Sequence, residues 1–84
     1  MAKKGLKMNI NPNTVQLHEA RYLIIEYINS TQQRIYTSAN FRTYINQRTG
    51  KLISTYQLST ALSQLVSIGK IRRIGTGIFT KTDD

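Results

Sequence analysis

The sequence predicts one small α+β domain, mainly α-helical, in which three helices are followed by a short C-terminal β-hairpin. Three observations lead to this fold class. The chain has 84 residues, which is enough for a single domain with one modest core. Three segments carry apolar residues at helical spacing behind capping residues. The last of them ends at a glycine, and two β-prone runs around a Gly-Thr-Gly turn follow it.

Residues 1–12 are expected to form a basic, flexible arm, and residues 13–82 are expected to form the domain. The arm ends in the turn-forming sequence Asn-Pro-Asn, and the last residue of this turn, Asn13, is the expected N-cap of the first helix. With Gln16 as the capping-box partner, this helix should run from about Thr14 to Ser30. Its core face is predicted to carry Leu17, Ala20, Ile24, Tyr27 and Ile28.

A brief strand is expected at 33–37, because this β-prone run is too short for a helix. Thr37 or Ser38 then caps a second helix that runs to about Arg48. Gly50 supplies the left-handed conformation that ends this helix. The core contacts of this helix are predicted to be Phe41, Tyr44 and Ile45.

The third helix has the clearest start signal, because Ser54 is the expected N-cap and Gln57 occupies the reciprocal capping-box position. It should end before Gly69, and the hairpin should occupy 71–81. The buried stripe of this helix is predicted to consist of Leu58, Ala61, Leu62, Leu65 and Val66.

Charge is the strongest functional signal in the composition. Twelve Lys and Arg against four Asp and Glu give a formal net charge of +8, and no acidic residue occurs between Tyr27 and Thr82. A surface of one sign attracts a polyanion, and each phosphate that it neutralises releases counterions. The charge pattern therefore favours nucleic acid as the ligand, with duplex DNA favoured and single strands as the alternative.

The order of these elements resembles the winged helix-turn-helix superfamily of DNA-binding proteins. Two segments carry the resemblance: Ile35–Phe41 is similar to the junction between the strand and the second helix, and Leu58–Phe79 is similar to the recognition helix, its terminal glycine and the wing. The resemblance covers roughly residues 14–81. It implies that the third helix lies in the major groove and that the wing follows the backbone or the minor groove.

The outer face of the third helix carries hydroxyl and amide side chains that are able to contact bases and phosphates, namely Thr55, Tyr56, Ser59, Thr60, Ser63, Gln64 and Ser67. No Lys or Arg lies between Lys51 and Lys70, so bidentate contacts of arginine with guanine are absent from this helix. We therefore expect limited base readout. Binding should depend on phosphate contacts from Arg42, Arg48, Lys51, Lys70, Arg72, Arg73 and Lys81. Because Arg72 and Arg73 are adjacent in a strand, they should face opposite sides of the hairpin.

A second apolar stripe is predicted on the first helix, formed by Val15, His18, Tyr22 and Ile25 and continued by Asn29. One interpretation is that the N-terminal arm covers it through Leu6, Met8 and Ile10. The other is that it binds a second copy of the chain or another protein. In that case the chain would be an interaction subunit that docks onto a larger DNA-processing enzyme such as a polymerase or helicase.

Catalysis, metal binding and membrane insertion are not expected. His18 and the two glutamates of the folded region are too few for an acid–base pair, and cysteine is absent. We therefore expect neither a metal site nor a cofactor. No apolar run approaches the length of a membrane span, and the basic N-terminus lacks the apolar stretch of a secretion signal. We expect a cytoplasmic DNA-binding protein that acts as a regulator or as an accessory factor in replication or recombination.

Overall fold

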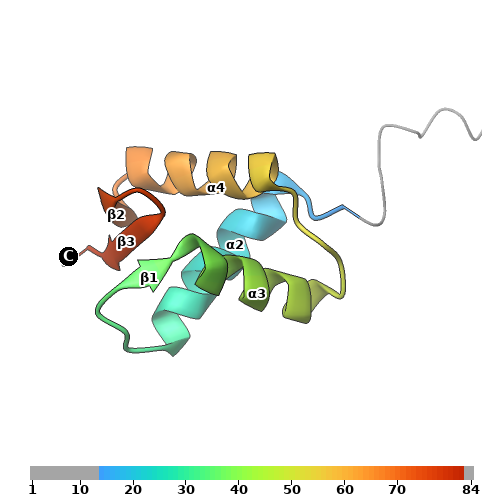
Figure 1. The fold of residues 1–84 in the computed structure, drawn as a ribbon, viewed down its shortest axis with the longest axis horizontal. Helices are drawn as coiled ribbons and strands as arrows, with labels where there is room; N and C mark the ends of the chain where they lie inside the picture. Colours follow the sequence, from blue (N-terminus) through green and yellow to red (C-terminus); the bar gives the residue numbers. More distant parts are fainter. Residues whose placement is uncertain (1–13, 83–84) are drawn as a thin grey trace, which may run out of the picture.

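The computed structural model describes residues 14–82, and its fold is α+β, mainly α-helical, with a C-terminal β-hairpin, as predicted. Its elements in chain order are α2 (Leu17–Ser30), β1 (Tyr36–Thr37), α3 (Ser38–Thr49), α4 (Thr55–Ser67), β2 (Ile71–Gly75) and β3 (Ile78–Lys81). Helix α2 packs against both α3 and α4, and the strands lie together at one end of the molecule (Figure 1). The three strands form an antiparallel sheet in the order β1-β3-β2.

The predicted start of the first helix was wrong by three residues. Helix α2 begins at Leu17, after an extended Gln16, and the Gln16 N–H donates to the carboxylate of Glu19 at 3.4 Å. Thr14 instead forms an isolated parallel bridge with Leu52. The expected N-cap, Asn13, lies outside the described residues.

Helix α3 begins and ends where the capping residues predicted. The Asn40 N–H donates to the Thr37 hydroxyl at 3.2 Å, and the Thr37 N–H donates to the Asn40 side chain at 3.0 Å. Gly50 ends the helix with φ +70°, a backbone conformation that is energetically unfavourable for residues with a side chain.

The predicted strand before this helix is shorter than expected, because only Tyr36 and Thr37 pair with β3. The next residue of β3, Thr80, instead donates a hydrogen bond from its hydroxyl to the carbonyl of Arg34.

Helix α4 is capped at Ser54, whose hydroxyl accepts the Gln57 N–H at 3.0 Å. The expected reciprocal bond is absent from the contacts of the described chain, because the Gln57 side chain donates to the carbonyl of Val15 at 3.4 Å. After α4, Gly69 adopts φ +79° and the chain turns into the hairpin. The hairpin turn is held against α3, since the Ser38 N–H donates to the Gly77 carbonyl at 3.0 Å.

The core lies where the three helices meet the inner face of the sheet. The predicted stripe of α4 is buried at Leu58, Ala61, Leu62 and Leu65, and Val66 is half-buried. The core face of α2 includes Leu23, which was not among the predicted core residues, while Leu17 and Tyr27 are half-buried at its margin. The largest fully buried side chains are the aromatic Tyr36, Phe41 and Phe79.

Candidate functional site

The exposed face of α4 forms one wall of a shallow groove of about 650 Å³. Because the leucine stripe of α4 points into the core, the opposite face carries the short polar side chains that the helical spacing predicted. Tyr56 at the start of the helix is 76 % exposed, and Ile68 just beyond its end is 64 % exposed. The groove between them is lined by Ser59, Thr60, Ser63, Gln64 and Ser67.

Arg21 of α2 completes this groove and was not predicted as a site residue. Its guanidinium donates to the side-chain oxygen of Gln64, which holds it beside the exposed face of α4. These two residues are separated by 43 positions in the sequence, and only the packing of α2 against α4 brings them together. The sequence offered one signal, since Arg21 is the only Lys or Arg in the first helix.

A second hollow, of about 280 Å³, lies where α3, α4 and the hairpin meet, and it brings together predicted residues from all three. Arg42 of α3 donates to the carbonyl of Ile53 at 2.9 Å and to the Thr55 hydroxyl at 3.2 Å. The guanidinium carbon of Arg73 lies 5.2 Å from the centre of the Phe79 ring. Arg42 and Arg73 therefore line the same hollow as Thr55.

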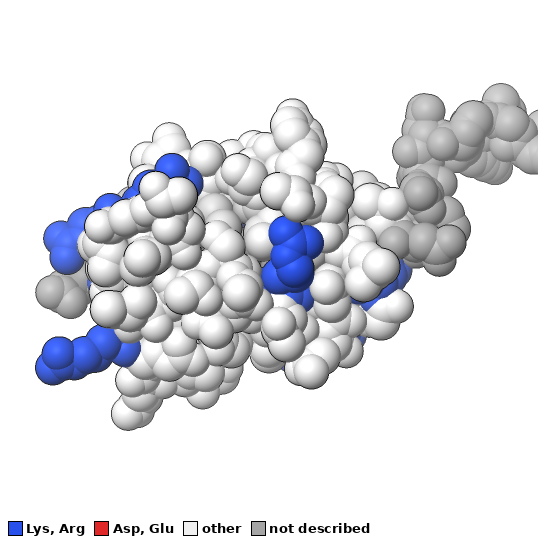
Figure 2. Space-filling model, viewed as in Figure 1, with Lys and Arg blue, Asp and Glu red and all other residues white. Residues whose placement is uncertain are grey.

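Separate groups of basic side chains lie on the face of the molecule that includes this region, and most of the rest of this face is uncharged. Figure 2 shows Lys and Arg side chains at the end formed by the hairpin and between α3 and α4, and no Asp or Glu of the described residues is visible on this face. The charge of this face is therefore of one sign. Such a surface concentrates anionic ligands near it.

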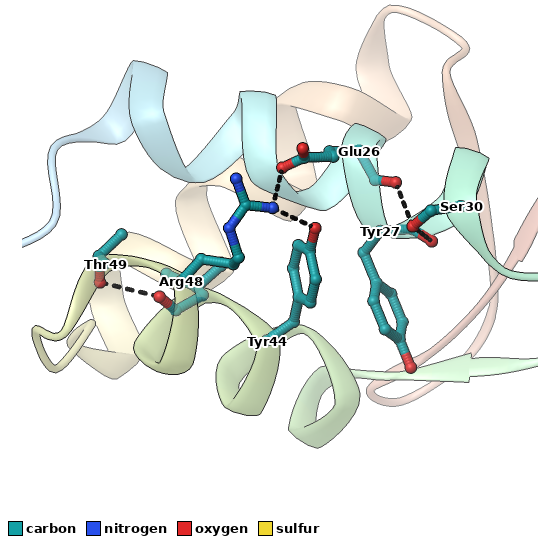
Figure 3. Close-up of polar contacts among 7 residues, drawn as sticks. Glu26, Tyr27, Ser30, Tyr44, Arg48 and Thr49 are labelled. Atoms are coloured by element: carbon teal, nitrogen blue, oxygen red, sulfur yellow. Dashed lines mark hydrogen bonds and ion pairs between the residues drawn. The ribbon is translucent and has the colours of Figure 1, made fainter.

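The two acidic residues of the described chain, Glu19 and Glu26, lie on α2, and each is close to a predicted DNA-binding base. Figure 3 shows Glu26 with its partner Arg48. Arg48 donates to Glu26 at 2.9 Å and to the Tyr44 hydroxyl at 2.7 Å, while Lys51 lies 4.0 Å from Glu19. The hydrogen bond to Glu26 and the charge of its carboxylate raise the pKa of Arg48. Arg48 and Lys51 line neither the α4 groove nor the second hollow. The structure therefore does not bring them to the predicted interface.

The hairpin separates its bases as the strand alternation predicted. Arg73 lies opposite Phe79 in the register, whereas Arg72 lies opposite Thr80, so the two arginines face different sides of the sheet. Arg72 and Lys81 line a further hollow with Arg34, which was not among the predicted site residues. Lys70 is exposed where the hairpin begins.

The predicted apolar stripe on the first helix is not a continuous surface. Val15 is fully buried and lies in the extended segment before α2, while Ile25 is half-buried against the core. His18, Tyr22 and Asn29 are exposed. The arm residues that were expected to cover this face, Leu6, Met8 and Ile10, lie outside the described residues. The prediction was therefore wrong for Val15, because the late start of α2 removes this residue from the helix.

Tyr27 and Tyr44 were predicted to be packing residues, and both pack against the core. Their ring centres are 4.9 Å apart, and Tyr27 also contacts Tyr36 and Phe41 edge-on. The two rings are half-buried and close the gap between α2 and α3. Tyr56, by contrast, is exposed on α4.

Comparison with models of protein families, with curated proteins and with solved structures found no match to this chain. None of the helices in residues 14–82 is long and apolar enough to cross a membrane. In the same residues, no three His, Cys, Asp or Glu side chains gather as ligands of a metal ion would.

Proposed function

We propose that this chain is a non-catalytic winged-helix protein that binds DNA, duplex in preference to single strands. The observation that carries the proposal is the exposed face of α4, which lacks carboxylates and is flanked by Arg21 on one side and by Arg42 and Arg73 on the other. The order of helices and strands supports the same assignment. We place the protein in the cytoplasm, as a regulator or as an accessory factor in replication or recombination.

The dimensions of α4 suit the major groove of duplex DNA. A helix of 13 residues is about 20 Å long, and the groove, about 12 Å wide, admits one helix. The side chains that would meet the bases are hydroxyls, one amide and Tyr56. Hydroxyls contact several base edges without strong discrimination, so this helix should follow the groove with little preference for sequence.

Arginines at the margins of α4 would supply the phosphate contacts. The ring of Phe79 supports Arg73 from below, which leaves the guanidinium donors of this exposed residue free for a phosphate. Arg42 has a different role, because two of its donors already hold the connection that leads into α4. We therefore treat Arg42 as a positioning residue and Arg73 as the main phosphate contact.

The test compares two variants that add the same charge to exposed helical positions. Ser63→Glu places a carboxylate in the middle of the α4 face, and Thr43→Glu places one on the exposed side of α3. Fluorescence anisotropy with a labelled DNA duplex should give about a tenfold loss of affinity for Ser63→Glu and less than about a twofold loss for Thr43→Glu. Equal losses for both would leave only a general charge effect and would contradict the proposed interface.

Salt dependence provides a second readout of the same proposal. The logarithm of the affinity should fall linearly with the logarithm of the salt concentration, and Arg73→Ala should reduce the magnitude of this slope by about 1. A wild-type affinity that does not change with salt would exclude binding dominated by phosphate contacts.

One observation favours a second function, docking onto a larger DNA-processing enzyme through α2. Tyr22 projects from α2 with 67 % of its surface exposed, and His18 one turn earlier is also exposed. The surface is small, because Val15 is fully buried and Ile25 is half-buried. Light scattering over a range of concentrations tests whether this face pairs with a second copy. Self-association that Tyr22→Glu abolishes would assign the face to a homodimer.

A further inference from the structure

A separate basic hollow lies on the outer face of the sheet, on the side opposite Arg73. It measures about 650 Å³, and its lining includes Arg34, Ile35, Arg72, Ile74, Thr80 and Lys81 beside Gln33. Arg72 lies opposite Thr80 in the register of β2 and β3, and both side chains point away from the core side of the sheet. The chain thus places a second group of three bases on a surface that the α4 face does not include.

The composition of this hollow is mixed rather than purely basic. Ile35 is 51 % exposed and Ile74 is 50 % exposed, and both lie among the three bases. No ion pair of residues 14–82 involves any of these bases, because Glu19 and Glu26 are paired elsewhere. A ligand that fits this surface has to satisfy positive charge and also cover apolar side chains.

We propose that this hollow binds an acidic segment of another protein that contains leucine or another large apolar residue. The phosphate backbone of a nucleic acid would neutralise the bases, but it offers little apolar surface to cover the two isoleucines. A peptide with carboxylates next to an apolar side chain supplies both kinds of contact within a few residues. Charge complementarity of this kind sets the choice of partner and speeds association.

The position of β3 determines how such a segment binds. Strand β3 is central in the sheet, with its backbone paired to β1 on one side and to β2 on the other. The backbone of β3 is therefore not free to pair with the segment, and we infer that the segment crosses the outer face and makes contact through side chains. Thr80 also fixes the position of Arg34 on this surface. Its hydroxyl donates to the Arg34 carbonyl at 3.1 Å, which holds the residues before β1 against the sheet.

The test uses the full chain and a short fluorescent peptide of glutamates and leucines, with a matched peptide in which serine replaces every leucine. Arg72→Glu should lower the affinity for the leucine peptide about tenfold, whereas Arg73→Glu, the adjacent residue on the other face, should change it less than about twofold. The same pair should respond in the opposite order in the DNA assay. The inference thus stands or fails independently of the proposed DNA binding.

A second variant protects the test against misfolding in the hairpin. Arg34 lies outside the strands, and Arg34→Glu should lower the affinity for the leucine peptide about as much as Arg72→Glu does. The serine peptide should bind several-fold more weakly than the leucine peptide, because it buries no apolar surface on the isoleucines.

Three results would overturn the proposal. Equal affinity for the two peptides would reduce the surface to a general polyanion site and assign it to nucleic acid. Equal effects of Arg72→Glu and Arg73→Glu would show that the peptide does not distinguish the two faces. Peptide binding that emerges only after Asp83→Asn and Asp84→Asn would assign the hollow to the C-terminal residues of the chain itself.

Discussion

The contact between Arg73 and Phe79 allows a quantitative test of how the hairpin positions its phosphate contact. Phe79 is 1 % exposed, and the guanidinium carbon of Arg73 lies 5.2 Å from the centre of its ring. Phe79→Leu keeps an apolar side chain in the core but removes the aromatic face under the arginine. A cation–π contact at an exposed site is worth about 0.5–1 kcal/mol. If that energy orders Arg73 for its phosphate, its loss should weaken DNA binding by about two- to fivefold.

The assay is a double-mutant cycle on DNA affinity, measured by anisotropy at a temperature where every variant is folded. Phe79→Leu should reduce affinity in the wild-type background and have little effect when Arg73 is already alanine, because the ring acts through the arginine. Its cost in stability should be below the roughly 3–5 kcal/mol of a Phe→Ala change in a core. The matched control is Phe41→Leu, a fully buried ring that contacts Phe79 and does not lie under an arginine.

The control separates loss of stability from loss of binding. Phe41→Leu should lower the unfolding temperature and leave the DNA affinity of the folded protein within about twofold. A loss of affinity on Phe79→Leu that is equally large in the Arg73→Ala background would refute the reasoning, since the ring would then act on some other part of the interface.

Three further predictions concern the fold that holds these surfaces. Tyr36→Phe should destabilise the domain by about 1 kcal/mol in chemical denaturation, because it removes the buried hydroxyl that lies 2.9 Å from the Thr31 hydroxyl. Gly77→Ala should cost about 1–2 kcal/mol, since φ is +68° there, whereas Gly75→Ala, whose added Cβ would make only ordinary contacts, should be close to neutral. Ser54→Ala should cost about 1 kcal/mol through loss of the α4 N-cap, and Ser54→Asp should restore most of it.

Features that depend on residues within one turn of each other were predictable from the sequence. The start of α3 follows from Thr37 and Asn40, which are three residues apart, and its end follows from Gly50. The outer face of α4 follows from helical periodicity alone. The opposite orientation of Arg72 and Arg73 follows from the alternation of side chains in a strand, which needs no knowledge of the rest of the fold.

Features that depend on contacts between distant segments were not predictable in the same way. The start of α2 was misplaced, because the bridge from Thr14 to Leu52 and the burial of Val15 are tertiary interactions that override local capping preference. Pairing of Arg48 with Glu26 across 22 positions needs the packing of α2 on α3. The contribution of Arg21 to the α4 groove needs the packing of α2 on α4.

The placement of the two glutamates determines which bases of the described chain are left without an ion-pair partner. Glu19 and Glu26 both lie on α2. Glu26 pairs with Arg48 in the last turn of α3, and Glu19 lies near Lys51 just after α3. Opposite charges at this distance largely cancel each other's field beyond a Debye length. Arg42 and the bases of the hairpin have no ion-pair partner among residues 14–82, so their field extends into solvent, where it attracts anions. For the proposed DNA binding, we therefore expect the duplex to approach the face that carries α4, although α4 itself carries no charge.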